Sequence, residues 1–444
     1  MSNNCLINKV ASFIKQNNLL DNSKRYIVAL SGGADSVSLL LILHQLCYNI
    51  EAAHCNFHLR GNDSNDDEDF CKTLCERLDI TLHIKHFNTE EYSSSHKISI
   101  EMAARELRYN YFNTLAIERN AEGICVAHHI NDVAETMLLN LVRGSGIKGL
   151  QGILPHRDNI IRPLLCVTRN EIEDFLISKH QDFKQDFTNF DDEINRNRLR
   201  INVIPQLEKI NNASILNMQR TAKRMVDAEQ LINIYIEEQR NKIVRQKDSF
   251  VSFNIADIIN EYFLYLLIKE YDFSSAQIEN IYSYIRSPQT GKVFSSYSHD
   301  LLIDRNQIII RKKTDYITQP IIINSTGTYN IAENKTLTIS FEDLDKNKSI
   351  PKSSNICFAD ADVIKFPLTL RRTCQGDRFI PFGMKQSKLV SDYLTDKKRN
   401  LFQKESQLVV TDNEEKIVWL VDERIDNRIR ITDKTKHIIK IIYE

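Results

Sequence analysis

Short apolar runs alternate with helix-like stretches over the first 210 or so residues of the chain. The runs at 26–30, 50–57, 82–87 and 124–127 have the length of buried strands, and the segments after them show the apolar spacing of helices. This alternation predicts a parallel sheet with helices on both faces. We therefore predict an α/β domain over residues 1–210 that binds its ligands at the carboxyl ends of the strands.

The pattern changes after Pro205. A long helical stretch over 206–246 and further helix beyond it predict a mainly helical central domain over 211–315. Strand-like runs appear from Gly291 onward, the first of them at 301–303 and 307–311, and one basic helix is expected around 389–398. The predicted architecture is thus a parallel-sheet α/β domain, then a helical domain, then a small α+β domain over 316–444.

The composition is that of an ordinary globular protein, with 42% hydrophobic and 26% charged residues among 444. No apolar run approaches the ~18 residues needed to span a bilayer, and the N-terminus lacks the pattern of a signal peptide. The nine cysteines include no CxxC pair, which argues against a disulfide framework, a zinc ribbon and an iron–sulfur cluster. We therefore expect a soluble, cytoplasmic protein that does not bind a membrane.

Basic residues are concentrated in two segments, although the net charge of the whole chain is only −1. Residues 196–224 hold seven Lys or Arg against one acidic residue, and residues 371–404 hold nine against three. Such runs are either solvated faces or surfaces that bind phosphate groups. The overall charge therefore gives no reason to expect a nucleic acid, whereas the local charge does.

A glycine-containing loop joins the first predicted strand to the helix after it, in a chain with only 12 glycines among 444 residues. Its backbone N–H groups and the helix N-terminus would form a cradle for an anion, and the carboxylate of Asp35 would fit there if Mg²⁺ lay between it and phosphates. The alternative is a glycine turn in which Ser or Asp only caps the helix. The loop reads Ser31-Gly32-Gly33-Ala34-Asp35-Ser36 and lacks the Gly-Lys-Ser/Thr of a Walker loop.

The SGGxDS sequence of this loop resembles the pyrophosphate loop (PP-loop) of the N-type ATP pyrophosphatases, whose fold is adenine nucleotide alpha hydrolase-like. Members of this superfamily cleave ATP between the α and β phosphates and adenylate an oxygen of a second substrate. The resemblance implies that ATP binds at the loop, with Mg²⁺ at Asp35 and no permanently bound cofactor. The loop alone does not choose among GMP, NAD and asparagine synthetases, tRNA thiolases and tRNA(Ile)-lysidine synthetases.

Four further clusters of polar residues follow the predicted strands or end the helices after them. Taken singly, each has a plain structural explanation, such as a hydrogen-bonded histidine at a strand end or a Glu–Arg pair on a helix surface. Together they resemble the HxxxHxLR, ExxAR, AHHxxDxxET and RGSGxxGLxG elements of the tRNA(Ile)-lysidine synthetase family. These matches begin at His54, Glu101, Ala127 and Arg143, and the resemblance continues at 162–165, 186–189, 196–200 and 371–383.

The resemblance implies an enzyme, a carbon–nitrogen ligase, that acts on the wobble cytidine of an isoleucine tRNA with a CAU anticodon. ATP would adenylate the C2 oxygen of the cytidine, and the ε-amine of free L-lysine would then displace AMP to form lysidine. The partners are therefore this tRNA and lysine, with no obligate protein partner. A second RNA-binding surface is expected because many RNAs carry cytidine.

The resemblance and the chemistry of the residues together suggest a role for each candidate. Asp132 and Glu135 are three apart on a predicted helix and face one way, so they suit a pocket for the cationic lysine. His128 or Asp132 would assist removal of the lysine proton. The catalytic candidates are Asp35, Arg105, His128, Asp132 and Glu135; the ATP-binding candidates are Ser31, Gly32, Gly33, Ala34, Asp35, Ser36, His54 and Arg143, with Arg105 as a further phosphate or AMP contact; the tRNA-binding candidates are Arg196, Arg198, Arg200, Arg371, Arg372, Arg378, Lys385 and Lys388.

Two other functions remain open. A tRNA thiolase of the same superfamily would need paired cysteines for sulfur transfer, and the close pair Cys71 and Cys75, one helical turn apart, is more typical of core packing. A catalytically silent RNA-binding protein could keep the loop as a scaffold, but it would have no use for carboxylates beside phosphates. An assay of pyrophosphate release with ATP, lysine and tRNA separates the three functions.

Overall fold

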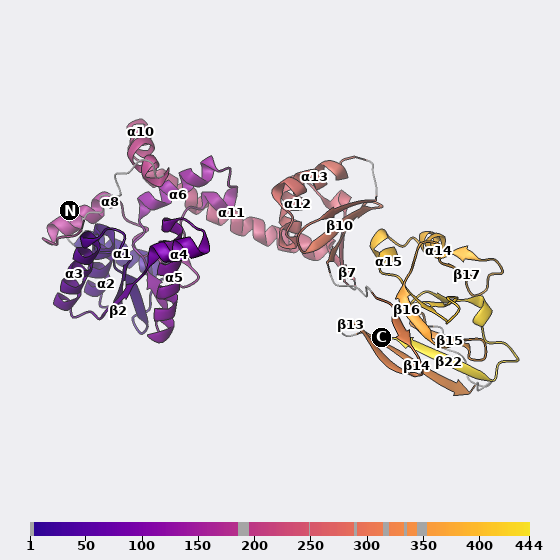
Figure 1. Cartoon of the computed structure of the whole chain (residues 1–444). Helices are drawn as coiled ribbons and strands as arrows, with labels where there is room; N and C mark the ends of the chain where they lie inside the picture. The colour runs from indigo at the N-terminus through magenta and orange to yellow at the C-terminus, as the bar shows by residue number, and fades with distance from the viewer. Residues whose placement is uncertain are drawn as a thin grey trace. The chain divides into compact units, whose positions relative to one another are not determined.

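The computed structural model divides into two compact units, Met1–Asn233 and Ile234–Glu444 (Figure 1). Within the part of the chain that the structure describes, no helix is long and apolar enough to cross a membrane. The matched segment Asp186–Asn189 lies outside the described residues. The structure describes residues 4–184, 195–247, 249–287, 291–313, 319–332, 335–343 and 353–444.

A six-stranded sheet forms the centre of the first unit. Its strands are β1 (Arg25–Ala29), β2 (Asn49–Asn56), β3 (Leu82–His86), β4 (Gly123–Cys125), β5 (His156–Arg157) and β6 (Ile160–Ile161). They lie in the order β3-β2-β1-β4-β6-β5, and every neighbouring pair is parallel except β5 with β6. Parallel strands joined through helices confirm the α/β class that the alternation predicts.

Helices cover both faces of this sheet. The helices of this part of the chain are α1 (Asn4–Gln16), α2 (Ala34–Gln45), α3 (Asn62–Arg77), α4 (Thr89–His96), α5 (Ile100–Glu118), α6 (Ile130–Val142), α7 (Ile147–Leu150), α8 (Arg169–Ser178), α9 (Asn195–Arg198), the π-helix η2 (Leu199–Val203), α10 (Ile204–Ile210) and α11 (Ser214–Ile243), which runs on into the second unit. Tyr26 and Ile27 of β1 belong to different hydrophobic clusters, because successive side chains of a strand point to opposite faces. Leu40 of α2 and Phe175 of α8 pack in the first cluster, and Phe112 of α5 packs in the second. Because β1 is buried on both faces, its sequence is a continuous run of mostly apolar residues.

The second unit begins within α11 and continues into a five-stranded antiparallel sheet of order β7-β8-β11-β10-β9. Its elements are β7 (Arg245–Lys247), β8 (Phe250–Asn254), η3 (Ile255–Asp257), α12 (Glu261–Ile268), η4 (Lys269–Tyr271), α13 (Ser275–Ile285), β9 (Lys292–Ser295), β10 (His299–Asp304) and β11 (Gln307–Lys312). The predicted helices are present, and the strand-like runs at 301–303 and 307–311 lie in β10 and β11, but the region also has strands that the sequence does not suggest, among them β7. The reason is that β7 is three exposed polar residues, which carry no apolar signal of a strand.

In the described residues, the rest of the second unit has two larger antiparallel sheets, of order β12-β16-β19-β20-β21 and β13-β14-β22-β15, and a two-stranded antiparallel sheet of β17 and β18. Trp419 of the first sheet and Ile439 of the second lie in one buried cluster, so the sheets share a core. This β-rich arrangement with two short helices agrees with the predicted α+β class. The elements are β12 (Ile321–Ile323), β13 (Gly327–Ala332), β14 (Lys335–Asp343), β15 (Ile356–Asp360), β16 (Leu368–Arg372), β17 (Arg378–Phe379), β18 (Lys388–Leu389), α14 (Val390–Asp396), α15 (Leu401–Glu405), β19 (Leu408–Thr411), β20 (Ile417–Leu420), β21 (Arg424–Ile425), η5 (Asn427–Ile429) and β22 (His437–Tyr443).

Candidate active site

The predicted nucleotide loop joins β1 to the N-terminus of α2. Gly32 has a φ of +88°, where a side chain would be strained, and a Cβ there would lie 3.5 Å from Cys71 Sγ. The Ser36 hydroxyl fixes the loop, since it accepts a hydrogen bond from the Ser31 N–H at 3.1 Å and donates one to the Gly33 carbonyl at 3.0 Å. The backbone is thus held in a turn at a helix N-terminus, which is an arrangement that binds anions.

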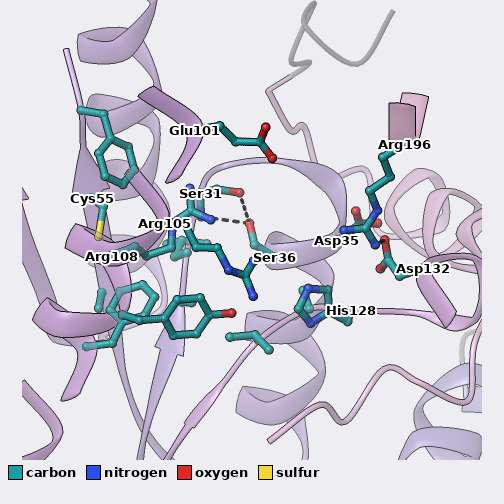
Figure 2. Close-up of a pocket in the computed structure, with 18 of the residues that line it drawn as sticks. Ser31, Asp35, Ser36, Cys55, Glu101, Arg105, Arg108, His128, Asp132 and Arg196 are labelled. Carbon is teal, nitrogen blue, oxygen red and sulfur yellow. Dashed lines mark hydrogen bonds and ion pairs between the residues drawn. The ribbon is translucent and has the colours of Figure 1, made fainter. Parts of the chain in front are cut away.

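A cavity of about 530 Å³ opens beside this loop (Figure 2). Its lining comes from the ends of β1, β2 and β4 and from α5, α6, α9 and η2. Three of the four sequence clusters therefore meet at one edge of the sheet, as the carboxyl ends of parallel strands do. The predicted site residues that line the cavity are Ser31, Asp35, Ser36, Arg105, His128, Asp132, Arg196 and Arg200.

Two arginines of α5 contribute to the cavity wall. The Cζ atom of Arg105 lies 5.1 Å from the ring centre of Tyr109, and that of Arg108 lies 5.3 Å from the ring centre of Phe57. A guanidinium stacked on a ring in this way keeps its N–H edge available for a ligand. Figure 2 shows Arg105 directed into the cavity beside Ser36. Two cations facing a phosphate loop suit a polyphosphate ligand.

The two carboxylates predicted to bind lysine are both buried, but only one of them reaches the cavity. Asp132 lines the cavity, whereas Glu135 is fully buried at 0% exposure. Arg196 Nε lies 2.6 Å from one oxygen of Glu135, and Arg200 Nε lies 2.7 Å from the other. A second N–H of Arg196 donates to Asp132 Oδ1 at 2.9 Å. Two arginines predicted to bind tRNA are therefore engaged with carboxylates of the active site.

His129 connects the nucleotide loop with α6. Its backbone N–H donates to Asp132 Oδ2 at 2.9 Å, and its Nε2 lies 3.7 Å from Asp35 Oδ1. Burial raises the pKa of Asp35, although His129 acts in the opposite direction. Burial also acts to raise the pKa of Asp132, but His129 and Arg196 outweigh it, so this pKa is lowered overall. The lowered pKa of Asp132 favours its carboxylate form, whereas the raised pKa of Asp35 means that a cation beside it would favour its ionised form.

The remaining predicted nucleotide ligands lie outside the cavity lining. His54 is buried, its Nδ1 is 2.9 Å from the Leu30 carbonyl oxygen, and burial lowers its pKa. Arg143 is exposed at the C-cap of α6. Residues 32–34 supply loop backbone. His54 thus contacts the carbonyl at the end of the strand that leads into the loop, and its assignment as a nucleotide ligand stays a prediction.

The basic residues predicted to bind tRNA in the second unit have unequal surroundings. Arg371 makes two hydrogen bonds to Asp377, at 2.8 and 2.9 Å, and this partner raises the pKa of the arginine. Arg378 is exposed, and its Nε lies 3.4 Å from the Ser387 hydroxyl. Among the other candidates, Lys388 pairs with Asp396, Arg372 is half-buried, and Lys385 and Arg198 are exposed.

The cavity also includes residues that the sequence analysis does not assign. Glu101, Arg108, Tyr109 and Asn197 line it. Arg162 contacts one of the lining residues, since its Nε donates to His128 Nδ1 at 3.2 Å. All five lie inside segments that match the family pattern or directly beside one, so the sequence marked the segments in which they occur. The matched pattern marks the segment, but it does not say which of its side chains reach the cavity.

The cysteines do not offer reactive thiolates to the cavity. Cys55 lines it, and burial raises the pKa of this thiol to about 12. Burial also raises the pKa of Cys75 to about 11 and that of Cys71 further still. Protonated thiols are poor nucleophiles. Cys71 and Cys75 belong to the main hydrophobic cluster of the first unit, which confirms their interpretation as core residues.

Among the described residues, no group of three or more His, Cys, Asp or Glu side chains could hold a metal ion. Asp35 offers one carboxylate that is 43% exposed. Mg²⁺ commonly takes one or two carboxylates and completes its shell with phosphates and water. The residues therefore fit a phosphate-bound Mg²⁺ and do not fit a metal enclosed by the protein.

Two family models match the chain, a PP-loop domain over residues 3–207 and a TilS substrate binding domain over residues 246–313. A tRNA(Ile)-lysidine synthase of Bacteroides thetaiotaomicron is 41% identical over 433 residues, which cover 97% of this chain and 98% of that protein. The chain belongs to the tRNA(Ile)-lysidine synthase family. Synthases of Parabacteroides distasonis and Clostridium acetobutylicum are 38% and 30% identical, and each match covers 98% or more of both chains.

Family membership confirms several of the expectations from the sequence. The resemblance to tRNA(Ile)-lysidine synthetases is correct, and the glycine loop is part of a PP-loop ATP-binding domain. The predicted class of enzyme, an ATP-dependent ligase that modifies tRNA, is confirmed with it. Family membership does not assign a role to any individual residue of the cavity.

Proposed function

We propose that this protein ligates free L-lysine to C2 of the wobble cytidine, position 34, of an isoleucine tRNA with a CAU anticodon, so that AUA is read in place of AUG. The observation that carries the proposal is the cavity, in which a pyrophosphate loop, two ring-stacked arginines and a carboxylate meet. Identity of 41% over 97% of the chain with a lysidine synthase supports it. The reaction consumes ATP and releases AMP and pyrophosphate.

The first half-reaction needs ATP with its α-phosphate turned toward the RNA base. The N–H groups of the loop at 31–36 and the N-terminus of α2 would bind the pyrophosphate portion. Arg105 and Arg108 would stabilise the charge that grows as the cytidine O2 attacks and the bond to pyrophosphate breaks. Mg²⁺ would be held by Asp35 and would offset the negative charge of the phosphates.

The second half-reaction needs a site for a cationic amino acid. Asp132 is the carboxylate of the pair that faces the cavity, and we assign it to the lysine ammonium. Glu135 would act from behind, because its two oxygens hold Arg196 and Arg200. The lysine amine then bonds to C2 of the cytidine, the C2–O bond breaks, and AMP leaves with the oxygen.

The RNA would need contacts beyond one cytidine. Exposed cations in the second unit, Arg378 and Lys385, would bind tRNA phosphates, and exposed Arg198 would do so in the first unit. Arg371 is a weaker candidate because Asp377 already binds it through two hydrogen bonds.

Mass spectrometry of the modified nucleoside tests the proposal directly. The full chain is incubated with an unmodified CAU isoleucine tRNA, ATP and isotope-labelled lysine, and the RNA is then digested to nucleosides. We expect a cytidine that has gained one labelled lysine less one water, and only when ATP and lysine are both present. A product that has gained sulfur would indicate a thiolase, and tRNA binding without pyrophosphate release would indicate a silent binding protein. Either result would contradict the proposal.

A further inference from the structure

The two adjacent histidines at the end of β4 have different surroundings. His129 is 2% exposed and is directed toward the acidic groups described above. His128 is half-buried and lines the nucleotide cavity, where Figure 2 shows its ring. His128 is thus the histidine that a substrate can reach.

Arg162 determines which nitrogen of His128 carries a proton. Its Nε donates to His128 Nδ1 at 3.2 Å. A guanidinium stays protonated and has no acceptor, so it can only donate. Nδ1 must therefore be an unprotonated acceptor, and the proton of the neutral ring lies on Nε2. Arg162 is itself fixed, because its Nη1 donates to the Leu154 carbonyl at 2.8 Å and its backbone N–H to the Pro155 carbonyl at 2.9 Å.

The surroundings of His128 favour its neutral form. Burial is the largest cause that lowers the pKa of this ring, to about 4. Asp132 opposes the shift, whereas Arg162, Arg196 and His129 add to it. A ring with this pKa is uncharged at neutral and alkaline pH, where the lysine amine becomes a nucleophile.

We propose that His128 acts on the substrates as a neutral hydrogen-bond donor through Nε2–H, and that Arg162 is the positioning residue that fixes this tautomer. This inference rests on the proposed function: it gives the catalytic candidate His128 a specific role and adds Arg162 to the site. The acceptor is an oxygen of the adenylyl group, on which charge grows while the cytidine O2 bonds to the α-phosphorus and the bond to pyrophosphate breaks. His128 neither gains nor loses a proton in this step.

The assignment removes one of the two bases that the sequence suggests for the lysine amine. Nε2 of His128 is already protonated, and Nδ1 faces a cation, so neither nitrogen can accept the proton. In the second step the amine nitrogen bonds to C2, the C2–O bond breaks, and the proton leaves the amine for solvent while the carboxylate of Asp132 holds the cationic amino acid. His128 remains a donor to the departing AMP.

Two amide substitutions distinguish a donor from a base. The side-chain nitrogen of Gln can take the place of Nε2, whereas that of Asn takes the place of Nδ1, and neither amide can act as a base. Adenylation is measured as pyrophosphate release in a single turnover, and lysidine by mass spectrometry. We expect His128→Gln to stay within about tenfold of the wild-type rate and His128→Asn to lose on the order of 10²–10³-fold, the usual effect of removing one donor to a developing oxyanion.

The role of Arg162 is tested through the pH profile of Arg162→Met. Without the guanidinium, the neutral ring can place its proton on either nitrogen, and only the imidazolium carries both protons. The rate of Arg162→Met divided by the wild-type rate should therefore rise as the pH falls, because acid restores the proton on Nε2. Ionisations that both proteins share cancel in this ratio. The same substitution in the His128→Gln background should give a flat ratio.

The outcomes separate this inference from the function on which it rests. If the wild-type protein forms no lysidine, the proposed function fails. If lysidine forms but His128→Gln and His128→Asn lose activity equally, His128 is a base or a structural residue and the inference fails. A ratio for Arg162→Met that falls with decreasing pH overturns the positioning role. The comparison of the two amides remains decisive even if Arg162→Met does not fold.

Discussion

The basic segments of the two units have similar charge patterns in the sequence and different surroundings in the structure. In the first unit, Arg196 and Arg200 are bound to Glu135, a carboxylate with 0% exposure. In the second unit, Arg371 is bound to half-buried Asp377, whereas Arg378 is exposed. The number of cations in a segment therefore does not indicate which of them can bind a phosphate. That depends on whether a carboxylate already pairs with the cation.

The comparison also separates two uses of an arginine. A pair with a fully buried carboxylate is costly to break, because the remaining charge keeps its desolvation cost without its partner. An exposed arginine contributes little to folding and is available for a counterion or a phosphate. Substitutions in the two segments should therefore affect different quantities, stability in one and RNA binding in the other.

The largest effect is expected for Glu135→Ala. Its removal takes away the fully buried carboxylate that binds Arg196 and Arg200, and leaves them Asp132, which lies 2.9 Å from Arg196 and 3.9 Å from Arg200. Loss of one partner of a buried ion pair costs about 3–5 kcal/mol, and we expect the lower end because the two guanidiniums are 36% and 25% exposed. The midpoint of chemical denaturation, followed on the full chain, measures the change.

A matched control is available in the same unit. Glu173 pairs with Arg169 at 3.0 Å, and both side chains are 42% exposed. Exposed pairs of this kind contribute at most about 1 kcal/mol, so Glu173→Ala should shift the midpoint only slightly. Equal shifts for Glu135→Ala and Glu173→Ala would show that the buried pair is not a structural support.

The second largest effect is expected for Asp132→Asn. Of the two carboxylates Asp132 and Glu135 on α6, Asp132 is the one that faces the cavity. Asp132→Asn keeps an acceptor for the His129 N–H but removes the charge that we assign to lysine binding. A hydrogen bond to a charged group contributes about 1.5–3 kcal/mol, so the KM for lysine should rise about 10–100-fold while the Kd for ATP changes little. Steady-state kinetics with varied lysine measure the first quantity and nucleotide titration the second.

Asp35→Asn serves as the counterpart because Asp35 lies in the nucleotide loop. It should weaken the Mg²⁺ dependence of ATP binding and leave the lysine KM nearly unchanged. An unchanged lysine KM in Asp132→Asn would mean that lysine binds elsewhere, and both carboxylates of α6 would then be structural.

Much of the fold and the position of the site could be predicted because their signals are local. The strand before the loop buries both of its faces, so Tyr26 and Ile27 appear as neighbours in one apolar run. The loop's glycines and the following helix are contiguous in the chain. The meeting of separate clusters at one edge followed from the rule that ligands bind at the carboxyl ends of parallel strands.

The partners of charged side chains could not be predicted in this way. Arg196 and Glu135 are 61 residues apart, and Arg162 and His128 are 34 apart. Such pairs depend on how helices and loops pack over the strand ends, and the spacing of residues in the sequence does not contain this information. The same limit applies to β7, an exposed polar strand that is recognisable only by its pairing with β8.

The smallest effect is expected for Arg378→Glu, and it is the one that tests the second unit. If Arg378 contacts a phosphate, charge reversal should weaken tRNA binding several-fold and reduce the salt slope, the change of log K with log salt, by about 1. Stability should not change, because the side chain is exposed. Arg371→Glu is the matched variant: it leaves Asp377 facing a like charge, so it should lower the melting temperature. Binding titrations at several salt concentrations and thermal melts measure both. A salt slope that is unaltered by Arg378→Glu would place the phosphate-binding surface outside the paired strands β17 and β18, the first of which contains Arg378.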